Sequence, residues 1–350
     1  MGIVSYGAYI PPYRITVKEI ARTWGADALK IEQGLGLIEK SVPGLDEDTA
    51  TNAVNAAFQA IERFGVKEAQ SIGAIYVGSE SHPYAVKPTA GIVGEALNIG
   101  NEWTAADLEF ACKAGTAGIQ AVIGLVESKR IKLGLAIGAD TAQGAPGDAL
   151  EYSAASAGAA FLLGTKKCIA KVIHTTSYTT DTPDFWRREH VQFPKHGGRF
   201  TGKPAYEQHV LAATQQLIRD TDITVEDVDH VVFHMPNGKF PKVVAKKLGV
   251  TSSQLEKGFV VPMVGNSYSA SSLVGLASVL DSAQPGEKIL LTSYGSGAGS
   301  DSFLFEVTDE IVEYREKAKT GIYTQTVLEQ TEQKSYLTYG QYVRHTKKLR

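Results

Sequence analysis

Along most of the chain, short apolar runs alternate with stretches in which apolar residues recur at helical spacing. Residues 2–9 form a β-branched and aromatic run that ends at two prolines, which predicts a first strand. Residues 48–63 combine helical spacing with an acidic start, a pattern typical of a long helix. A buried-strand pattern at 71–78 and a helical pattern at 89–97 follow. Strands that alternate with helices predict an α/β fold with largely parallel sheets.

The second half of the chain repeats this order of elements. The apolar run 228–234 corresponds to 72–78, and a predicted helix over 240–248 follows it. We therefore expect two duplicated halves, residues 1–168 and 169–350. Ligand sites in α/β folds lie at the carboxyl ends of strands, so two facing halves would deliver side chains from both into one cleft.

Three segments fall outside the repeat. The first half carries a longer loop at roughly residues 141–158. Residues 174–207 are polar and aromatic without periodicity, which predicts an ordered loop that covers a site. The tail 309–350 is rich in tyrosine and threonine and ends in basic residues. The sequence leaves open whether this tail packs as an extra hairpin or contacts a partner.

Composition narrows the class of protein. The 350 residues can bury a sizeable core, and a net charge of −3 argues against nucleic acid or an anionic membrane as the main partner. Cys112 and Cys168 are the only cysteines, too few for a disulfide framework. The sequence begins without a basic segment and apolar signal core, and no apolar run is long enough to cross a bilayer. We expect a cytoplasmic protein.

Cys112 is the first candidate for chemistry. A short, largely apolar stretch of sequence ends at this cysteine, and a helix that begins with small residues follows it. Cys112 should therefore lie at a strand-to-helix turn. The helix dipole and the unpaired N–H groups there would stabilise a thiolate, the form that attacks a carbonyl carbon. The alternative is a small buried apolar side chain at the start of a packed helix.

Glu80, His234 and Asn266 join Cys112 because each follows an apolar run. Glu80 and Cys112 are 32 residues apart, as are His234 and Asn266, which predicts equivalent positions in the two halves. Alone, each has an ordinary explanation: a solvated loop acid, a hydrogen-bonded imidazole and a turn residue. Together, a nucleophile, an imidazole, an amide and a carboxylate are typical of an acyl-transfer site. The other histidines show no metal-ligand spacing, and no glycine-rich phosphate loop follows a strand.

Several motifs resemble a known family. The Ala111-Cys112 helix start, His234 followed by Pro-Asn-Gly-Lys, and Gly-Asn-Ser-Tyr-Ser-Ala-Ser at 265–271 resemble the thiolase superfamily of condensing enzymes. More narrowly, the chain resembles the archaeal-type 3-hydroxy-3-methylglutaryl-CoA synthases over essentially its whole length. The resemblance implies a thiolase fold, in which two duplicated halves form a five-layer αβαβα sandwich.

The resemblance also implies a reaction. Cys112 takes the acetyl group of acetyl-CoA, and Glu80 removes a methyl proton so that the carbanion attacks the ketone of acetoacetyl-CoA. His234 polarises and protonates the ketone oxygen, and water releases 3-hydroxy-3-methylglutaryl-CoA for the mevalonate and isoprenoid pathway. Glu80 is the discriminating residue, because a decarboxylating synthase obtains its carbanion by losing CO2 and needs no base there. No metal or organic cofactor is implied.

Further residues match ligand positions of the family. The backbone N–H of Cys112 and one from the turn 295–297 are expected to form an oxyanion hole. Val243 stands where the family pattern has an arginine, and Lys242 or Lys246 could replace that contact. The residues expected to bind substrate or CoA are Asp27, Ala28, Ser153, Arg199, Thr201, Lys239, Asn266 and Ser296.

The resemblance extends to partners, and two other functions stay open. It implies a homodimer and a complex with an acetoacetyl-CoA thiolase and a small zinc-ribbon, OB-fold scaffold protein. One alternative is a ketoacyl synthase III-like enzyme acting on a carrier protein, which would not require Glu80. The other is a catalytically silent subunit of an acyl-CoA assembly, in which Cys112 would not become acetylated.

Overall fold

The framework of the computed structural model, which describes residues 1–65, 67–319, 321 and 324–348, is a continuous order of nine strands. It divides at a short strand pairing into two parts with matching strand order, called here the first and the second sheet. The first sheet has the order β5 (Thr104–Leu108), β4 (Ile72–Gly78), β6 (Leu133–Asp140), β7 (Ala157–Gly164) and β1 (Gly2–Tyr9). The second has the order β11 (His230–Phe233), β12 (Lys288–Thr292), β13 (Gly299–Val307) and β8 (Ala170–Thr179). In each sheet the first strands are parallel and the last two pairings are antiparallel. A short pairing of β1 with β8 joins the sheets, and β5 has no counterpart in the second.

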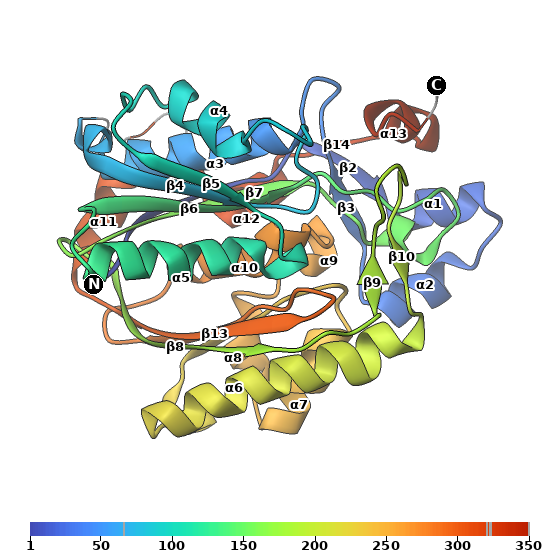
Figure 1. The fold of residues 1–350 in the computed structure, drawn as a ribbon. Helices are drawn as coiled ribbons and strands as arrows, with labels where there is room; N and C mark the ends of the chain where they lie inside the picture. The colour runs from blue at the N-terminus through green and yellow to red at the C-terminus, as the bar shows by residue number, and fades with distance from the viewer. Residues whose placement is uncertain (66, 320, 322–323, 349–350) are drawn as a thin grey trace.

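The helices and sheets form five layers (Figure 1). The outer face of the first sheet is covered by α3 (Thr49–Phe64) and α4 (Thr89–Ala96), and that of the second by α6 (Glu207–Thr221) and α7 (Phe240–Leu248). The central layer contains α5 (Ala114–Glu127) and α10 (Ser271–Leu280). Nearly every residue of α10 is buried, as expected of a helix with a sheet on either side. The predicted αβαβα sandwich is confirmed.

Glycines let the two central helices approach the strand ends closely. A Cβ on Gly78, the last residue of β4, would lie 2.2 Å from the Ala114 carbonyl carbon at the start of α5. A Cβ on Gly138 of β6 would lie 2.4 Å from the Ser269 carbonyl oxygen, just before α10. The turns that open both central helices therefore lie directly against the carboxyl ends of the first sheet's strands.

The segment 174–207, predicted as a covering loop, begins instead as a strand. Residues 174–179 belong to β8, which pairs with β13 inside the second sheet. The covering part starts after Thr179 and contains a short hairpin of β9 (Phe185–Trp186) and β10 (Lys195–His196). This hairpin lies at the end of the molecule where α2 (Ala28–Leu35) is found (Figure 1).

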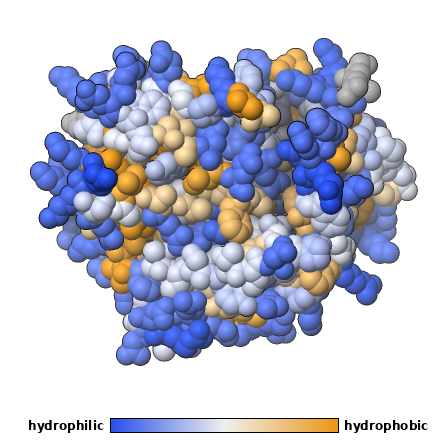
Figure 2. Space-filling view, in the orientation of Figure 1, coloured by the Kyte–Doolittle hydropathy of each residue, from blue (hydrophilic) through white to orange (hydrophobic). Residues whose placement is uncertain are grey.

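The free edge of the first sheet is β5, on the face that α5 also reaches. Thr104 and Ala105 of β5 are exposed, and so are Ala121 and Gly124 of the neighbouring α5. Figure 2 shows a broken band of apolar residues across the middle of the face on which α5 lies in Figure 1. Among the described residues, no helix is both long and apolar enough to cross a membrane.

The tail is mostly helical. It contains α11 (Glu310–Ala318), α12 (Val327–Glu332), β14 (Ser335–Tyr336) and α13 (Tyr339–His345). The two residues of β14 pair with β2 (Tyr13–Thr16), which in turn pairs with β3 (Glu39–Val42). The tail thus adds one strand to a small three-stranded sheet with β2 and β3 and does not form an extra hairpin.

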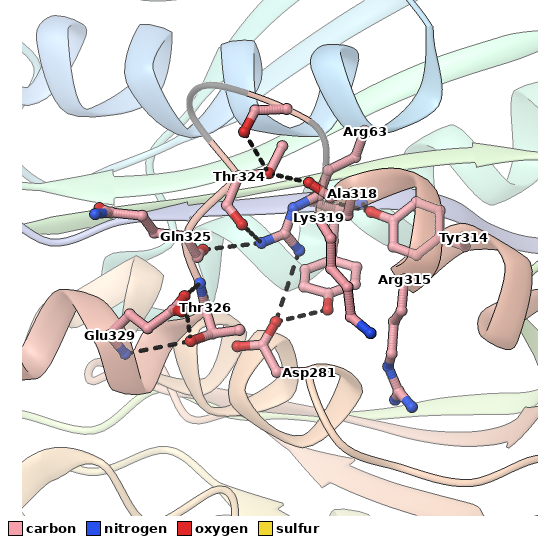
Figure 3. Close-up of a pocket in the computed structure, with 12 residues that line it drawn as sticks. Arg63, Asp281, Tyr314, Arg315, Ala318, Lys319, Thr324, Gln325, Thr326 and Glu329 are labelled. Carbon is pink, nitrogen blue, oxygen red and sulfur yellow. Dashed lines mark hydrogen bonds and ion pairs between the residues drawn. The ribbon is translucent and has the colours of Figure 1, made fainter.

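A buried ion pair holds the middle of the tail. Arg63 and Asp281 lie 3.6 Å apart beside a pocket of about 390 Å³ (Figure 3). Arg63 donates to the Gln325 carbonyl at 2.8 Å, and Asp281 accepts from the Val327 N–H at 2.7 Å. Both charged groups therefore satisfy backbone groups of the tail as well as each other.

Candidate active site

Cys112 lies at the turn that leads from β5 into α5, as the sequence predicts. It belongs to a 3₁₀ turn, Ala111–Lys113, that runs directly into the helix. Ala111 has a φ of 44°, a left-handed conformation that is uncommon outside glycine, so the chain bends sharply just before the cysteine. The Cys112 side chain lines a cavity although the residue is only 4% exposed.

The Glu80 carboxylate, just beyond β4, is the hydrogen-bond partner of the thiol. The Cys112 Sγ–H donates to Glu80 Oε2 at 3.4 Å. Burial raises the pKa of Glu80 well above its ordinary value, and Asp140 raises it further. Burial, Glu80 and Asp140 likewise raise the pKa of the Cys112 thiol. The expectation of a thiolate stabilised by the helix dipole is therefore wrong for the resting protein, because burial beside two carboxylates outweighs the dipole.

Asp140 is a second carboxylate at this site, which the sequence analysis missed. It ends β6 and is fully buried. Its Oδ1 accepts hydrogen bonds from the Ser79 and Ser81 hydroxyls, both at 2.6 Å, and from the Glu80 N–H at 2.9 Å. Its Oδ2 accepts from the hydroxyl and the N–H of Ser269 in the second half. The available signal was an acidic residue directly after an apolar strand, the same signal that marked Glu80.

His234 approaches the cavity from the end of β11. Its N–H donates to the Thr292 carbonyl at 2.9 Å, and its carbonyl accepts from the Tyr206 hydroxyl at 2.7 Å. The ring packs beside Tyr206 and Tyr294, whose centroids lie 6.5 and 6.4 Å away. Burial lowers the pKa of His234 to about 3, so the imidazole is neutral at pH 7. Nδ1 is buried without a hydrogen-bond partner among the described residues.

Asn266 links the cavity wall of the first half to the second half. Its N–H donates to the Ser153 carbonyl at 2.7 Å, and its carbonyl accepts from the Ala155 N–H at 2.8 Å. Its side-chain Oδ1 accepts from the Tyr268 N–H at 2.9 Å, which is the turn role expected of an asparagine in this position. The same residue thus shapes a turn and lines the cavity.

The cavity has a volume of about 330 Å³, at the lower end of the range for small-molecule sites. Aromatic side chains, including Phe185, Tyr268 and Phe240, form much of its wall. Glu80 does not itself line the cavity; it lies behind Cys112, with which it shares a hydrogen bond. The sequence-predicted residues that line the cavity are Cys112, Ser153, Thr201, His234, Lys239, Asn266 and Ser296.

Asp184 holds the covering segment in place through hydrogen bonds. The sequence did not indicate it as a site residue. The fully buried Asp184 carboxylate accepts from the Tyr294 hydroxyl at 2.6 Å and from the Gly297 N–H at 2.8 Å. Its carbonyl accepts from the Thr201 hydroxyl at 2.6 Å. Since the Gly297 N–H is already bonded, the Ser296 N–H is the better candidate in this turn for an oxyanion hole.

Three predicted ligand residues lie outside the cavity. Asp27 is the exposed N-cap of α2, where its carboxylate accepts from the Lys30 N–H at 3.2 Å, and Ala28 begins that helix. Arg199 is exposed next to Gly198, which does line the cavity. Their role as ligand contacts stays a prediction, and it would concern the part of a long ligand that lies outside the cavity.

Neither lysine proposed to replace an arginine at Val243 lines the cavity. Lys242 Nζ lies 4.8 Å from the centre of the Phe259 ring, and Lys246 lines the same surface groove. Val243 itself is 37% exposed. The groove is separate from the cavity, so these lysines could meet only the outer part of a ligand.

Comparison with known proteins decides the family. Residues 218–307 match the family model described as 3-oxoacyl-[acyl-carrier-protein (ACP)] synthase III C terminal. The chain is 57% identical over 350 residues to a hydroxymethylglutaryl-CoA synthase of Archaeoglobus fulgidus, with 100% of this chain and 99% of the relative covered. The enzyme of the same name from Methanocaldococcus jannaschii gives the same identity and coverage. This chain belongs to the hydroxymethylglutaryl-CoA synthase family.

Solved structures agree with the fold of this synthase. MvaS in complex with 3-hydroxy-3-methylglutaryl coenzyme A superposes with a TM-score of 0.88 at 22% identity, covering 100% of this chain and 92% of that one. The curacin-pathway HMG synthase in complex with holo donor-ACP gives a TM-score of 0.87 at 23% identity, covering 99% of this chain and 88% of that one. At these identities the likeness is one of fold, and it agrees with the five layers and the duplicated strand order.

Proposed function

We propose that this synthase condenses acetyl-CoA with acetoacetyl-CoA and water to give 3-hydroxy-3-methylglutaryl-CoA and CoA, through an acetyl group on Cys112. The observation that carries the proposal is the 3.4 Å contact between the Glu80 carboxylate and Cys112 Sγ at the wall of the cavity that His234 lines. A base beside the sulfur is what a reaction that deprotonates a sulfur-bound acetyl group requires.

Acetyl transfer comes first. Because burial and neighbouring carboxylates keep Cys112 protonated, its proton must leave as sulfur attacks the acetyl carbonyl. Glu80 accepts the thiol hydrogen bond and is the group placed to receive that proton. The departing CoA thiolate takes up a proton, so the step exchanges one thioester for another. The backbone N–H groups of Cys112 and Ser296 are the proposed donors to the carbonyl oxygen.

Condensation follows once acetoacetyl-CoA has replaced CoA. The raised pKa makes Glu80 a stronger base than an ordinary carboxylate, and it takes a proton from the acetyl methyl group. The resulting carbanion attacks the ketone carbon of acetoacetyl-CoA. Neutral His234 donates an N–H hydrogen bond to the ketone oxygen and passes its proton to the new alkoxide, and the proton that Glu80 took from the methyl group restores the neutral imidazole. Water then hydrolyses the thioester at Cys112 and regenerates the thiol.

We place the acyl and pantetheine end of each CoA thioester in the cavity and the anionic end outside it. Lys239 lines the cavity and is the proposed cation at its mouth. Arg199, Asp27 and Ala28 lie beyond the cavity and are proposed to contact the outer part of the ligand. We propose no metal or organic cofactor; full activity after dialysis against EDTA is the expected result.

Further proposals concern partners. The free β5 edge and the exposed small residues of α5 support a homodimer through this face. The family resemblance supports a complex with an acetoacetyl-CoA thiolase and a zinc-ribbon, OB-fold scaffold, in which a shared cleft would raise the effective concentration of the intermediate. Co-elution of the three purified proteins tests the complex, and cell fractionation tests the proposed cytoplasmic location.

The deciding experiment is intact-protein mass spectrometry. Wild-type protein, Cys112→Ala and Glu80→Ala are exposed briefly to acetyl-CoA and then to acetoacetyl-CoA, with Cys168→Ala as the cysteine-matched control. We expect one acetyl group on wild type and Cys168→Ala, none on Cys112→Ala, and discharge by acetoacetyl-CoA only when Glu80 is intact. Equal discharge in Glu80→Ala would instead support a ketoacyl synthase III-like enzyme, to whose family model residues 218–307 correspond. No acetylation with or without the proposed partners would mean a silent subunit.

A further inference from the structure

Glu151 is a fully buried acid directly behind the cavity wall, and the proposed reaction does not use it. It lies in the helical turn Ala149–Tyr152, in which Ala149 and Leu150 line the cavity, as does the following Ser153. A buried carboxylate needs several donors to replace its hydration, so the origin of those donors shows what holds this wall in place.

Two of the four donors to Glu151 come from the C-terminal tail. Its Oε2 accepts from the Trp24 indole N–H at 3.0 Å and from the Gly147 N–H at 2.7 Å. Its Oε1 accepts from the Tyr339 hydroxyl of α13 at 3.0 Å and from Lys348 Nζ at 3.2 Å. The side chains of Lys348 and Glu151 are 1% and 0% exposed, so this is a buried ion pair rather than a surface one.

A second set of contacts from the tail reaches the same wall. The Tyr342 hydroxyl accepts from Lys348 Nζ at 2.6 Å and from Lys40 Nζ at 3.0 Å. Lys40 is fully buried and also donates to the Ala154 carbonyl at 2.7 Å. Ser153 and Ala155, on either side of Ala154, form backbone hydrogen bonds with Asn266. The tail is therefore connected directly to Glu151 and, through Lys40, to Ala154, whose two neighbours bond to Asn266.

We propose that Lys348, Tyr342 and Glu151 are positioning residues, through which the C-terminal tail fixes the wall at 149–155 so that it binds the CoA thioester. The inference rests on the proposed function, because it assigns the wall to thioester binding. None of the three residues contacts Cys112 or Glu80 in the structure. Their loss should therefore weaken substrate binding, where preorganisation of the wall matters, more than the chemical steps.

Lys348→Met tests the proposal because it keeps the length of the side chain and removes its charge. Steady-state kinetics should show KM for acetoacetyl-CoA raised about tenfold or more with kcat within about threefold of wild type. Glu151→Gln should have a similar effect, and the double variant should be no worse than the poorer single one, since the two groups act as a pair. Lys348→Arg, which keeps the charge, should recover much of the wild-type KM.

Two lysines of the same tail provide matched controls. Lys334 pairs with the buried Glu39 at 2.7 Å, away from the cavity wall, and Lys347 is exposed. Lys334→Met and Lys347→Met should keep the wild-type KM, even if Lys334→Met lowers the melting temperature. An unchanged KM in folded Lys348→Met and Glu151→Gln would overturn the proposal, as would an equal rise in Lys334→Met, which would mean general loosening of the tail.

A binding measurement separates this proposal from the proposed function. If wild type forms no 3-hydroxy-3-methylglutaryl-CoA, the proposed function fails while calorimetric titration with CoA can still compare wild type and Lys348→Met. Weaker CoA binding by Lys348→Met than by wild type and Lys334→Met supports the positioning role. Equal binding by all three rejects it. Should Lys348→Met not fold, the same comparison is made with Glu151→Gln, or with Lys348→Arg against wild type.

Discussion

At Cys112 two electrostatic effects oppose each other. The helix N-terminus favours a thiolate, whereas burial, Glu80 and Asp140 favour the neutral thiol. Burial and the two carboxylates outweigh the helix N-terminus, so the thiol stays protonated in the resting state and donates a hydrogen bond to Glu80. Burial and Asp140 raise the pKa of Glu80, and they outweigh the hydrogen bond from Cys112, which lowers it. A raised pKa suits a base that must remove a proton from carbon.

The first prediction at this scale concerns the pH dependence of condensation. Because Glu80 must be ionised, discharge of acetyl-Cys112 by acetoacetyl-CoA should slow as the pH falls through the raised pKa of Glu80. Single-turnover rates between pH 5 and 9 should therefore show an acid limb above the ordinary glutamate pKa of about 4.3. Glu80→Gln should lower the rate at the plateau by about 10²–10⁴-fold. A flat profile over this range would show that the pKa of Glu80 is not raised during condensation, and an unchanged plateau rate in Glu80→Gln would show that Glu80 is not the base.

The second prediction follows from the low pKa of His234. Its folded pKa of about 3 lies below the ordinary value of 6.5, so the unfolded chain binds a proton in this window that the folded protein does not. The free energy of unfolding should therefore fall as the pH drops from 6.5 toward 3, by at most about 1.4 kcal/mol per unit from this residue.

Urea denaturation of wild type and His234→Gln at pH 7 and pH 5 isolates that contribution, because the other titrating groups are common to both proteins. Wild type should lose up to about 2 kcal/mol more than His234→Gln between the two pH values. Identical losses would mean that His234 titrates normally in the folded state.

At the scale of elements, Gly78 controls how closely α5 lies against β4. Gly78→Ala would place Cβ 2.2 Å from the Ala114 carbonyl carbon, so the helix start must move. We expect a loss of about 1–3 kcal/mol in stability from overpacking. Acetyl discharge should also slow at least about tenfold, since the shift separates Cys112 from Glu80, two residues beyond Gly78.

Gly91→Ala in α4 is the matched control for that change. A Cβ at Gly91 meets only the Pro88 Cγ at 3.6 Å, an ordinary contact, and alanine is the better helix former. Its stability should stay the same or rise by up to about 1 kcal/mol, with unchanged kinetics. Equal behaviour of the two variants would show that the close approach at Gly78 is not important for the site.

Local pattern predicted the elements whose burial follows a simple period. The run 2–9 became β1, and 240–248 became α7, with the bounds expected from the sequence. The polar pattern of residues 174–179 predicts a loop, but these residues form a strand because they pair with β13, a contact that local pattern does not contain. The tail was undecided for the same reason, since its anchors at Arg63 and Glu151 are distant in sequence.

The equal 32-residue spacings predicted side chains that the structure brings together, but these side chains are not strictly equivalent in the two halves. If Phe161 and Phe303 correspond, strand register matches Tyr76 with Val232. His234 then corresponds to Gly78 rather than Glu80. The turns before α5 and α10 likewise match Cys112 with Ser269 rather than Asn266. Side chains beyond a strand end can reach one cavity from different positions, so the site tolerates the offset.

Parts of the site escaped prediction because their roles depend on contacts between residues that are distant in sequence. Asp140 is important because Ser269, from the other half, donates to it, and Asp184 because Tyr294 and Gly297 do. A sequence pattern marks a residue at a strand end, as it did for Cys112. It does not show which distant donors will surround a carboxylate.

At the scale of the whole molecule, one face of the described chain carries the unpaired edge strand β5, with which a second copy could pair. Pairing of β5 with β5 of another protomer would satisfy the edge strand and bring the exposed Ala121 faces of α5 together in an isologous contact. Sedimentation should show wild type as a dimer and Ala121→Glu as a monomer, because the substitution places two like charges in an interface of small residues. Val312→Glu, a similar change at a 53% exposed position of α11, should stay dimeric. A monomeric wild type would reject the dimer, and a dimeric Ala121→Glu would place its interface on another face.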